Sequence, residues 1–188
     1  PGGFATTADA FRDFIAEKVW QNSMLPGYSM VPPGIEGYTP AMAKYADMPQ
    51  IDREDAAKKI LKKLGYTPEH PLKMEIRYNT SENHKNTAVA IQEQLKPLGV
   101  DVTLLNTDTK THYSFLEQKG DYDVARAAWI ADYKYPDTFR GISCKASGNN
   151  YSNYDSTQYD GAMDKAAAAG GKPEERMKEL SEAERILV

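Results

Sequence analysis

Cysteine is almost absent from this chain of 188 residues, which contains only Cys144. A single cysteine excludes an internal disulfide and any zinc site built from cysteines. The segment around Cys144 is rich in Ser, Gly and Asn and offers neither a histidine nor a clear helix amino terminus to activate a thiol. We therefore expect Cys144 to be a small, inert and partly buried side chain.

The chain also lacks an excess of positive charge, because 23 Lys and Arg residues stand against 27 Asp and Glu, a net charge of -4. Nucleic-acid binders usually show a basic stripe, so no nucleic-acid partner is expected. No apolar run approaches the roughly 18 residues that span a bilayer. No charged-then-apolar secretory leader stands at the amino end, so we expect any export signal to have been removed or to lie outside this sequence.

Motifs for catalysis and metal binding are missing as well. The three histidines, His70, His84 and His112, lack metal-binding spacing, so neither a metal nor another cofactor is predicted. There is no Gly-rich phosphate loop, nucleophile elbow or Cys–His pairing. A triad of Ser81, His84 and Asp132 can be imagined, but Ser81 is better explained as a helix cap. A hydrolase is therefore the weaker interpretation.

What the sequence does contain is an alternation of strand and helix patterns. Strands are predicted over 72–78, 100–105 and from Tyr122 onward, and helices over 6–21, 52–64, 81–98, 112–119, 158–169 and from Pro173. Such alternation implies parallel pairing through right-handed crossovers, so the predicted fold class is α/β, with a mixed, mostly parallel sheet flanked by helices. Residues 25–45 are dense in Pro and Gly and are expected to be ordered but irregular.

The stretch DYDVARAAWIADY, residues 121–133, resembles a buried strand but carries Arg126 and Asp132. Burying an unpaired charge costs several kcal/mol, so each charge needs a partner. In an extended strand the two residues share a face with their Cα atoms about 20 Å apart, at roughly 3.3 Å per residue. Ligands of open parallel sheets bind beyond the carboxyl ends of the strands. A short extended peptide could therefore place its ammonium on Asp132 and its carboxylate on Arg126; local structural partners are the open alternative.

His84 and His112 both lie near the start of a predicted helix. His84 follows the strand over 72–78, where a cationic imidazole could meet a carboxylate, or it could be a solvated surface histidine. His112 is expected to be exposed, in the turn from a loop into a helix.

Three stretches, WQNSMLPGYSMVPPGIEGY, YNTSENHKNTAVAIQEQLKPLGVDVTLLN and DYDVARAAWIADYKYPDTF, resemble the carboxy-terminal lobe of the extracytoplasmic oligopeptide-binding proteins that serve ABC importers. The resemblance runs from about Phe11 to Val188. It implies that residues 1–188 form a single truncated lobe that lacks the first lobe and a final return segment. It also implies a periplasmic location, or a lipid-anchored extracytoplasmic one in a Gram-positive source.

The resemblance further implies a binding role without catalysis, with an oligopeptide ligand, the missing amino-terminal lobe and a membrane permease as partners. By motif position, Asp132 matches the aspartate that pairs with the peptide's α-ammonium, and Arg126 the arginine that takes a short peptide's α-carboxylate. His84 matches a histidine that meets the carboxylate of a longer peptide. Trp129, Ile130 and Ala131 match backbone and wall positions beside the ligand.

Related receptors carry nickel complexes, haem, glycans or opines, but Asp132 favours a ligand with a free amine. The chain departs from the family pattern at Asp108 and Thr109, where relatives often have a Glu-Trp pair, and one extra residue precedes Phe115. Because buried terminal charges need a closed cleft, the chain by itself is expected to bind peptide weakly or not at all.

Overall fold

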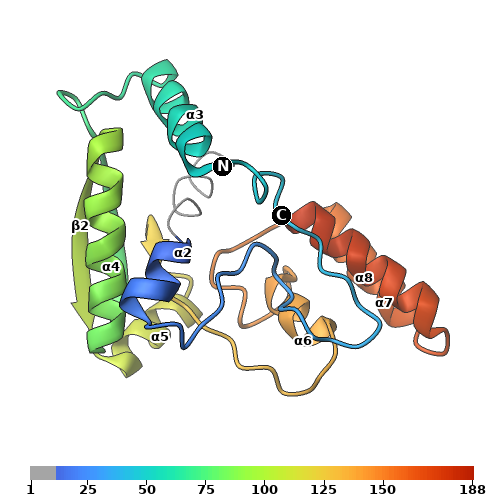
Figure 1. Cartoon of the computed structure of the whole chain (residues 1–188). Helices are drawn as coiled ribbons and strands as arrows, with labels where there is room; N and C mark the ends of the chain where they lie inside the picture. The colour runs from blue at the N-terminus through green and yellow to red at the C-terminus, as the bar shows by residue number, and fades with distance from the viewer. Residues whose placement is uncertain (1–11) are drawn as a thin grey trace. The chain divides into compact units, whose positions relative to one another are not determined.

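The computed structural model describes residues 12–188, which divide into two compact units (Figure 1). Of the described residues, unit 1 holds 12–26, 47–114 and 121–127, and unit 2 holds 27–46, 115–120 and 128–188. Each unit has its own apolar core. The prediction of a single lobe over residues 1–188 stays a prediction.

Unit 1 is built on a parallel sheet. Its strands are β1 (Leu72–Asn79), β2 (Val100–Thr107) and β3 (Val124–Ala125), in the order β2-β1-β3. Both neighbouring pairs are parallel, and α4 (Glu82–Leu95) makes the crossover from β1 to β2. Parallel neighbours need such a crossover because the chain must return to the same end of the sheet. The predicted α/β class with a parallel sheet and flanking helices is confirmed.

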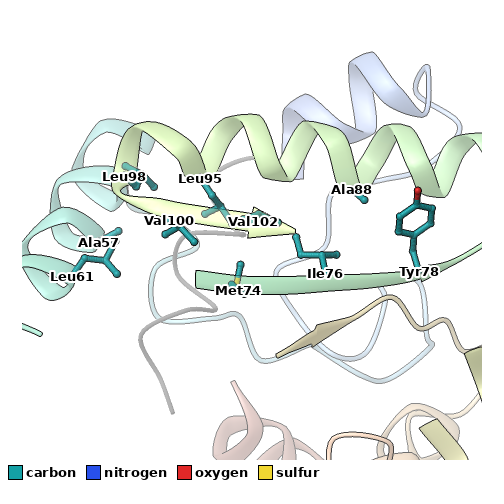
Figure 2. Packing of buried hydrophobic residues seen from close by; sticks show 10 residues of the cluster. All are labelled: Ala57, Leu61, Met74, Ile76, Tyr78, Ala88, Leu95, Leu98, Val100 and Val102. Carbon is teal, nitrogen blue, oxygen red and sulfur yellow. The ribbon is translucent and has the colours of Figure 1, made fainter. Parts of the chain in front are cut away.

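The core of unit 1 lies between this sheet and two helices (Figure 2). Helix α3 (Gln50–Lys63) contributes Ala57 and Leu61, and α4 contributes Ala88 and Leu95. The strand side of the core comes from alternate residues of β1 and β2: Met74, Ile76, Tyr78, Val100 and Val102. Each fully buried aliphatic side chain stabilises the fold by about 1.5–3 kcal/mol relative to an exposed one, so this layer holds the sheet and helices together.

The boundaries of the helices follow local backbone rules. Helix α3 begins at Gln50, after Pro49, so the predicted start at residue 52 is two residues late and Asp52 lies in the first turn. Gly65 ends this helix with a φ of +90°, a left-handed conformation that suits glycine. Ser81 occupies the N-cap position of α4 as predicted, although its side chain makes no capping hydrogen bond.

The predicted helix over 6–21 begins outside the described residues. Its described part contains α2 (Arg12–Phe14) and a short π-helix, η1 (Ile15–Val19). The Pro- and Gly-rich residues 25–45 form neither helix nor strand, as expected. Helix α5 (Thr109–Glu117) begins three residues before the predicted 112–119.

Unit 2 is mainly helical. Helices α7 (Thr157–Ala168) and α8 (Pro173–Leu187) pack against each other, close to the predicted 158–169 and the predicted start at Pro173. A single turn, α6 (Asp137–Arg140), packs on α8 and continues into the 3-10 turn η3 (Gly141–Ser143). Small side chains on the helices, including Ala162, Ala166 and Ala183, are fully or nearly buried.

Candidate functional site

The segment that carries the predicted site is much less regular than the sequence suggested. The prediction of an extended strand from Tyr122 to Asp132 is wrong. β3 comprises only Val124–Ala125, and residues 126–131 form no helix or strand. β3 is an edge strand whose two residues pair with Ile76 and Arg77 of β1, and the ladder extends beyond it by one hydrogen bond only, from Arg126. Arg126 and Asp132 therefore do not share one face of a strand. Arg126 belongs to unit 1 and Asp132 to unit 2, and the predicted separation stays untested.

Arg126 lies at the carboxyl edge of the unit 1 sheet. Its backbone N–H donates to the carbonyl of Arg77 at 2.9 Å, which continues the ladder by one bond. Its guanidinium Nη1 donates to the hydroxyl of Tyr113 at 3.0 Å and to Oδ1 of Asn79 at 3.4 Å. Both partners are neutral, and no carboxylate of the described residues forms an ion pair with Arg126. The half-buried guanidinium thus keeps its positive charge unmatched within the described part of the chain.

His112 is buried next to Arg126, so the prediction of an exposed histidine is wrong. It is 0% exposed, and its Nε2 donates to the backbone carbonyl of Arg126 at 2.7 Å. Burial lowers the pKa of the His112 imidazole, and the positive charges of Arg77 and Arg126 add to this shift, while the hydrogen bond to the Arg126 carbonyl opposes it. The sequence held one signal of this position: His112 stands four residues before Leu116, the spacing of a buried helix face.

His84 lies at the same edge of the sheet. Its Nδ1 is 3.0 Å from the carbonyl oxygen of Asn79. Because a carbonyl can only accept, Nδ1 carries the hydrogen, and Nε2 remains available for another group. The Trp20 ring centroid is 6.3 Å from that of His84, and the Trp20 indole N–H donates to the hydroxyl of Thr87 at 3.0 Å. The structure therefore brings His84 and Arg126 together at one sheet edge, where both contact Asn79.

Asp132 lies in an irregular segment of unit 2. Its backbone N–H donates to the hydroxyl of Thr138 at 3.4 Å, and the indole N–H of Trp129 donates to the same oxygen at 3.3 Å. The Asp132 side chain is exposed and makes no hydrogen bond or ion pair with any residue from 12 to 188. Ile130 is 88% exposed, and Ala131 is exposed as well. The acid and its apolar neighbours are thus presented at the surface of their own unit.

Cys144 lies in unit 2 and is half-buried. Burial raises the pKa of the Cys144 thiol, and the charges of Asp160 and Asp164 add to the effect, so this half-buried cysteine is held in its unreactive neutral form. The described residues contain no group of three or more His, Cys, Asp or Glu side chains that could hold a metal ion. None of the helices described is long and apolar enough to cross a membrane.

Comparison with known proteins gives the family. The family model "Bacterial extracellular solute-binding proteins, family 5 Middle" matches residues 12–151. The chain belongs to family 5 of the bacterial extracellular solute-binding proteins.

Individual relatives agree with this assignment. The periplasmic murein peptide-binding protein MppA of Escherichia coli is 34% identical over 178 residues, which cover 94% of this chain and 33% of MppA. The periplasmic oligopeptide-binding protein OppA of Haemophilus influenzae is 38% identical over 180 residues, again 94% of this chain and 33% of the relative. The crystal structure of that OppA in complex with RPPGFSPFR superposes with a TM-score of 0.86 at 35% identity, over 97% of this chain and 37% of the other. The chain thus spans about a third of the length of these curated relatives, and the predicted resemblance is confirmed.

Proposed function

We propose that this chain forms part of the ligand-binding region of an extracytoplasmic solute-binding protein that captures peptides for an ABC importer. Membership of the family and the peptide-binding names of similar proteins support this proposal. Under it the chain has no catalytic role. The ligand is a short peptide, and the partners are a further lobe of the receptor and a membrane permease.

The single observation that carries the proposal is the unmatched guanidinium of Arg126. Its two hydrogen-bond partners, Tyr113 and Asn79, are neutral, and both approach the same nitrogen, Nη1. Arginine pairs strongly with carboxylates because it can donate two parallel hydrogen bonds to their oxygens. We assign to Arg126 the α-carboxylate of a short peptide. His84, whose Nε2 is available at the same edge, would meet the carboxylate of a longer one.

The amino end of the peptide is assigned to Asp132. Its carboxylate is exposed in unit 2 and makes no contact with a described cation, so it can pair with an α-ammonium. Trp129, Ile130 and Ala131 precede it and would line the first part of the peptide. Such charge pairs become strong only when water is excluded, so affinity depends on closure of the remaining lobe over the peptide.

The test uses the full-length receptor and a tripeptide with free ends, measured by isothermal titration calorimetry. Asp132→Ala should weaken binding by about 13- to 150-fold, as expected for loss of a charged hydrogen bond worth roughly 1.5–3 kcal/mol. Asp164→Ala, which removes another exposed carboxylate from unit 2, is the matched control and should bind like the wild type.

The N-acetylated tripeptide completes the test. It should bind poorly to the wild type and should lose little further affinity in Asp132→Ala, because it has no ammonium. Unchanged affinity of the free tripeptide in Asp132→Ala would overturn the amine-anchor role and would favour a solute without a free amine.

A further inference from the structure

Thr138 is a buried residue whose hydroxyl accepts two hydrogen bonds from the segment that carries Asp132. It is 5% exposed and receives the indole N–H of Trp129 and the backbone N–H of Asp132. We infer that Thr138 is the positioning residue of the peptide's amino-end site: its hydroxyl fixes the Trp129–Asp132 segment and so sets the direction of the Asp132 carboxylate. This inference rests on the proposed function for the role of Asp132, but the geometry can be tested without a ligand.

The segment needs such a support because it has little structure of its own. Residues 128–131 form no helix or strand, and Asp132 lies in a bend. Within the described part of unit 2, residues 128–132 make two hydrogen bonds, and both go to the hydroxyl of Thr138. A threonine hydroxyl has two lone pairs, so one oxygen can accept both donors. Removing that oxygen would leave the segment without a hydrogen-bonded attachment to its unit.

Thr138 is itself held by the anchoring of α6. A helix of one turn is not stable alone, so its position must come from tertiary contacts. At its start, the guanidinium of Arg176 in α8 donates to the Asp137 carboxylate at 2.6 Å. The same guanidinium lies 4.7 Å from the centre of the Tyr135 ring. These contacts attach the beginning of α6 to α8.

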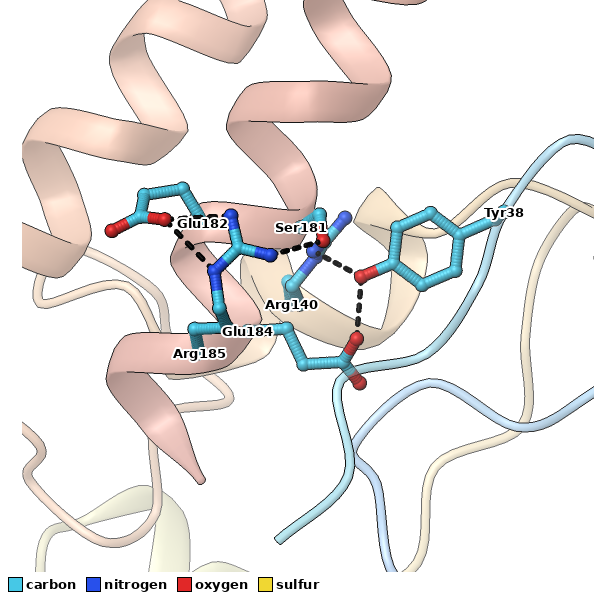
Figure 3. Close-up of polar contacts among 6 residues, drawn as sticks. All are labelled: Tyr38, Arg140, Ser181, Glu182, Glu184 and Arg185. Atoms are coloured by element: carbon cyan, nitrogen blue, oxygen red, sulfur yellow. Dashed lines mark hydrogen bonds and ion pairs between the residues drawn. The ribbon is translucent and has the colours of Figure 1, made fainter. Parts of the chain in front are cut away.

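The end of α6 is attached to unit 2 as well. The Tyr159 hydroxyl of α7 donates to the backbone carbonyl of Arg140 at 2.6 Å. The Arg140 side chain is fully buried and donates to the hydroxyl of Tyr38, which in turn donates to the carboxylate of Glu184 (Figure 3). With both ends fixed, α6 presents the Thr138 oxygen at a defined place. A site held by a supported element is positioned more accurately than one on a free loop.

The ligand-free test uses the indole signals of the chain in a proton–nitrogen NMR spectrum. The sequence contains two tryptophans, and in each case the indole N–H donates to a threonine hydroxyl: Trp129 to Thr138 and Trp20 to Thr87. Thr138→Val removes the acceptor with almost no change of shape. It should shift the Trp129 indole signal and speed hydrogen exchange at the Asp132 amide, while the Trp20 signal stays in place.

Thr87→Val is the matched control and should give the reverse pattern, moving the Trp20 signal alone. Thr138→Ser keeps the oxygen and should preserve both Trp129 and Asp132 signals. Should Thr138→Val prove poorly folded, Thr138→Ala tests the same loss of the acceptor. The inference is overturned if variants without the oxygen leave the Trp129 indole and the Asp132 amide unchanged.

The binding test is a double-mutant cycle in the full-length receptor. Loss of a neutral hydrogen bond costs about 0.5–1.5 kcal/mol, so Thr138→Val should weaken a free tripeptide by about 2- to 13-fold. That loss should disappear in the Asp132→Ala background and with an N-acetylated tripeptide, because both lack the ion pair that Thr138 positions.

The outcomes separate the two proposals. If Asp132→Ala binds the free tripeptide like the wild type, the amine-anchor function fails, and the NMR result alone decides whether Thr138 fixes the segment. If Asp132→Ala weakens binding but Thr138→Val has the same effect with and without Asp132, the function stands and the positioning role is overturned.

Discussion

Tyr38 and Glu184 are joined by a buried hydrogen bond in unit 2, although they stand 146 positions apart in the sequence (Figure 3). The Glu184 carboxylate also accepts from the backbone N–H groups of Val31 at 2.7 Å and Ala41 at 2.8 Å. Glu184 is 0% exposed. One carboxylate of α8 therefore satisfies three donors of the irregular segment at residues 27–46 and holds that segment in place.

Glu184→Gln should destabilise the chain strongly. The NH2 group of the new amide can only donate, whereas the carboxylate oxygen that it replaces accepts hydrogen bonds. Loss of hydrogen bonds to a buried charge costs roughly 1.5–3 kcal/mol each, and a net loss of about 2–4 kcal/mol is expected in the free energy of unfolding. Urea denaturation followed by circular dichroism measures it. Glu182→Gln, an exposed change two residues earlier in the same helix, should stay within about 0.5 kcal/mol of the wild type. Equal stability of the two variants would contradict the role of Glu184.

The buried Tyr38 should make the chain lose stability at alkaline pH. Burial, together with the hydrogen bond to Glu184, raises the pKa of Tyr38 to about 12. Between about pH 10, where an unfolded tyrosine loses its proton, and pH 12, the folded state binds the extra proton, so the free energy of unfolding falls as pH rises. The advantage of the wild type over Tyr38→Phe should shrink by about 1 kcal/mol between pH 9 and pH 11 in urea titrations. A gap that is constant over this range would be inconsistent with the raised pKa.

Substitution by alanine should change the stability of the chain in opposite directions at Gly161 and Gly99. Gly161 lies inside α7 with nothing within 4 Å of an added Cβ, so Gly161→Ala should stabilise the chain by about 0.5–1 kcal/mol. Gly99 has a φ of +86°, and an added Cβ would lie 3.1 Å from the carbonyl carbon of Thr67. Gly99→Ala should therefore destabilise it by about 1 kcal/mol or more. Thermal unfolding distinguishes the two, and shifts of the same sign would refute the backbone argument.

The buried His112 should make the chain lose stability as the pH falls below neutral. Its pKa is lowered chiefly by burial, so the unfolded state takes up a proton first as pH falls below about 6.5. The stability that the neutral His112 contributes is present above this pH and is lost as pH falls toward the folded-state pKa. His112→Gln keeps a donor for the Arg126 carbonyl but does not titrate. Its unfolding free energy should fall less than that of the wild type between pH 7 and pH 5, and parallel curves would argue against a buried neutral histidine.

Short-range patterns in the sequence predicted most elements but few of their partners. Apolar periodicity and Pro173 were enough to recognise the strands β1 and β2 and the helices α4, α7 and α8, because such signals act over a few residues. The length of β3 was overestimated, since an apolar run cannot reveal that a neighbouring strand pairs with only two of its residues. His112 was misplaced because its hydrogen-bond partner, the backbone carbonyl of Arg126, lies outside its own helix.

The sequence by itself determined the α/β class, the family and the residues that carry charge in DYDVARAAWIADY. The tertiary structure decided which groups those charges contact. Arg126 donates to neutral oxygens of Tyr113 and Asn79, and Asp132 is exposed beside Thr138. The physical reason is that periodicity and turn residues are local properties of a chain. The pairing of a charge, by contrast, is set by groups that folding brings near it from distant positions, as Glu184 and Tyr38 also show.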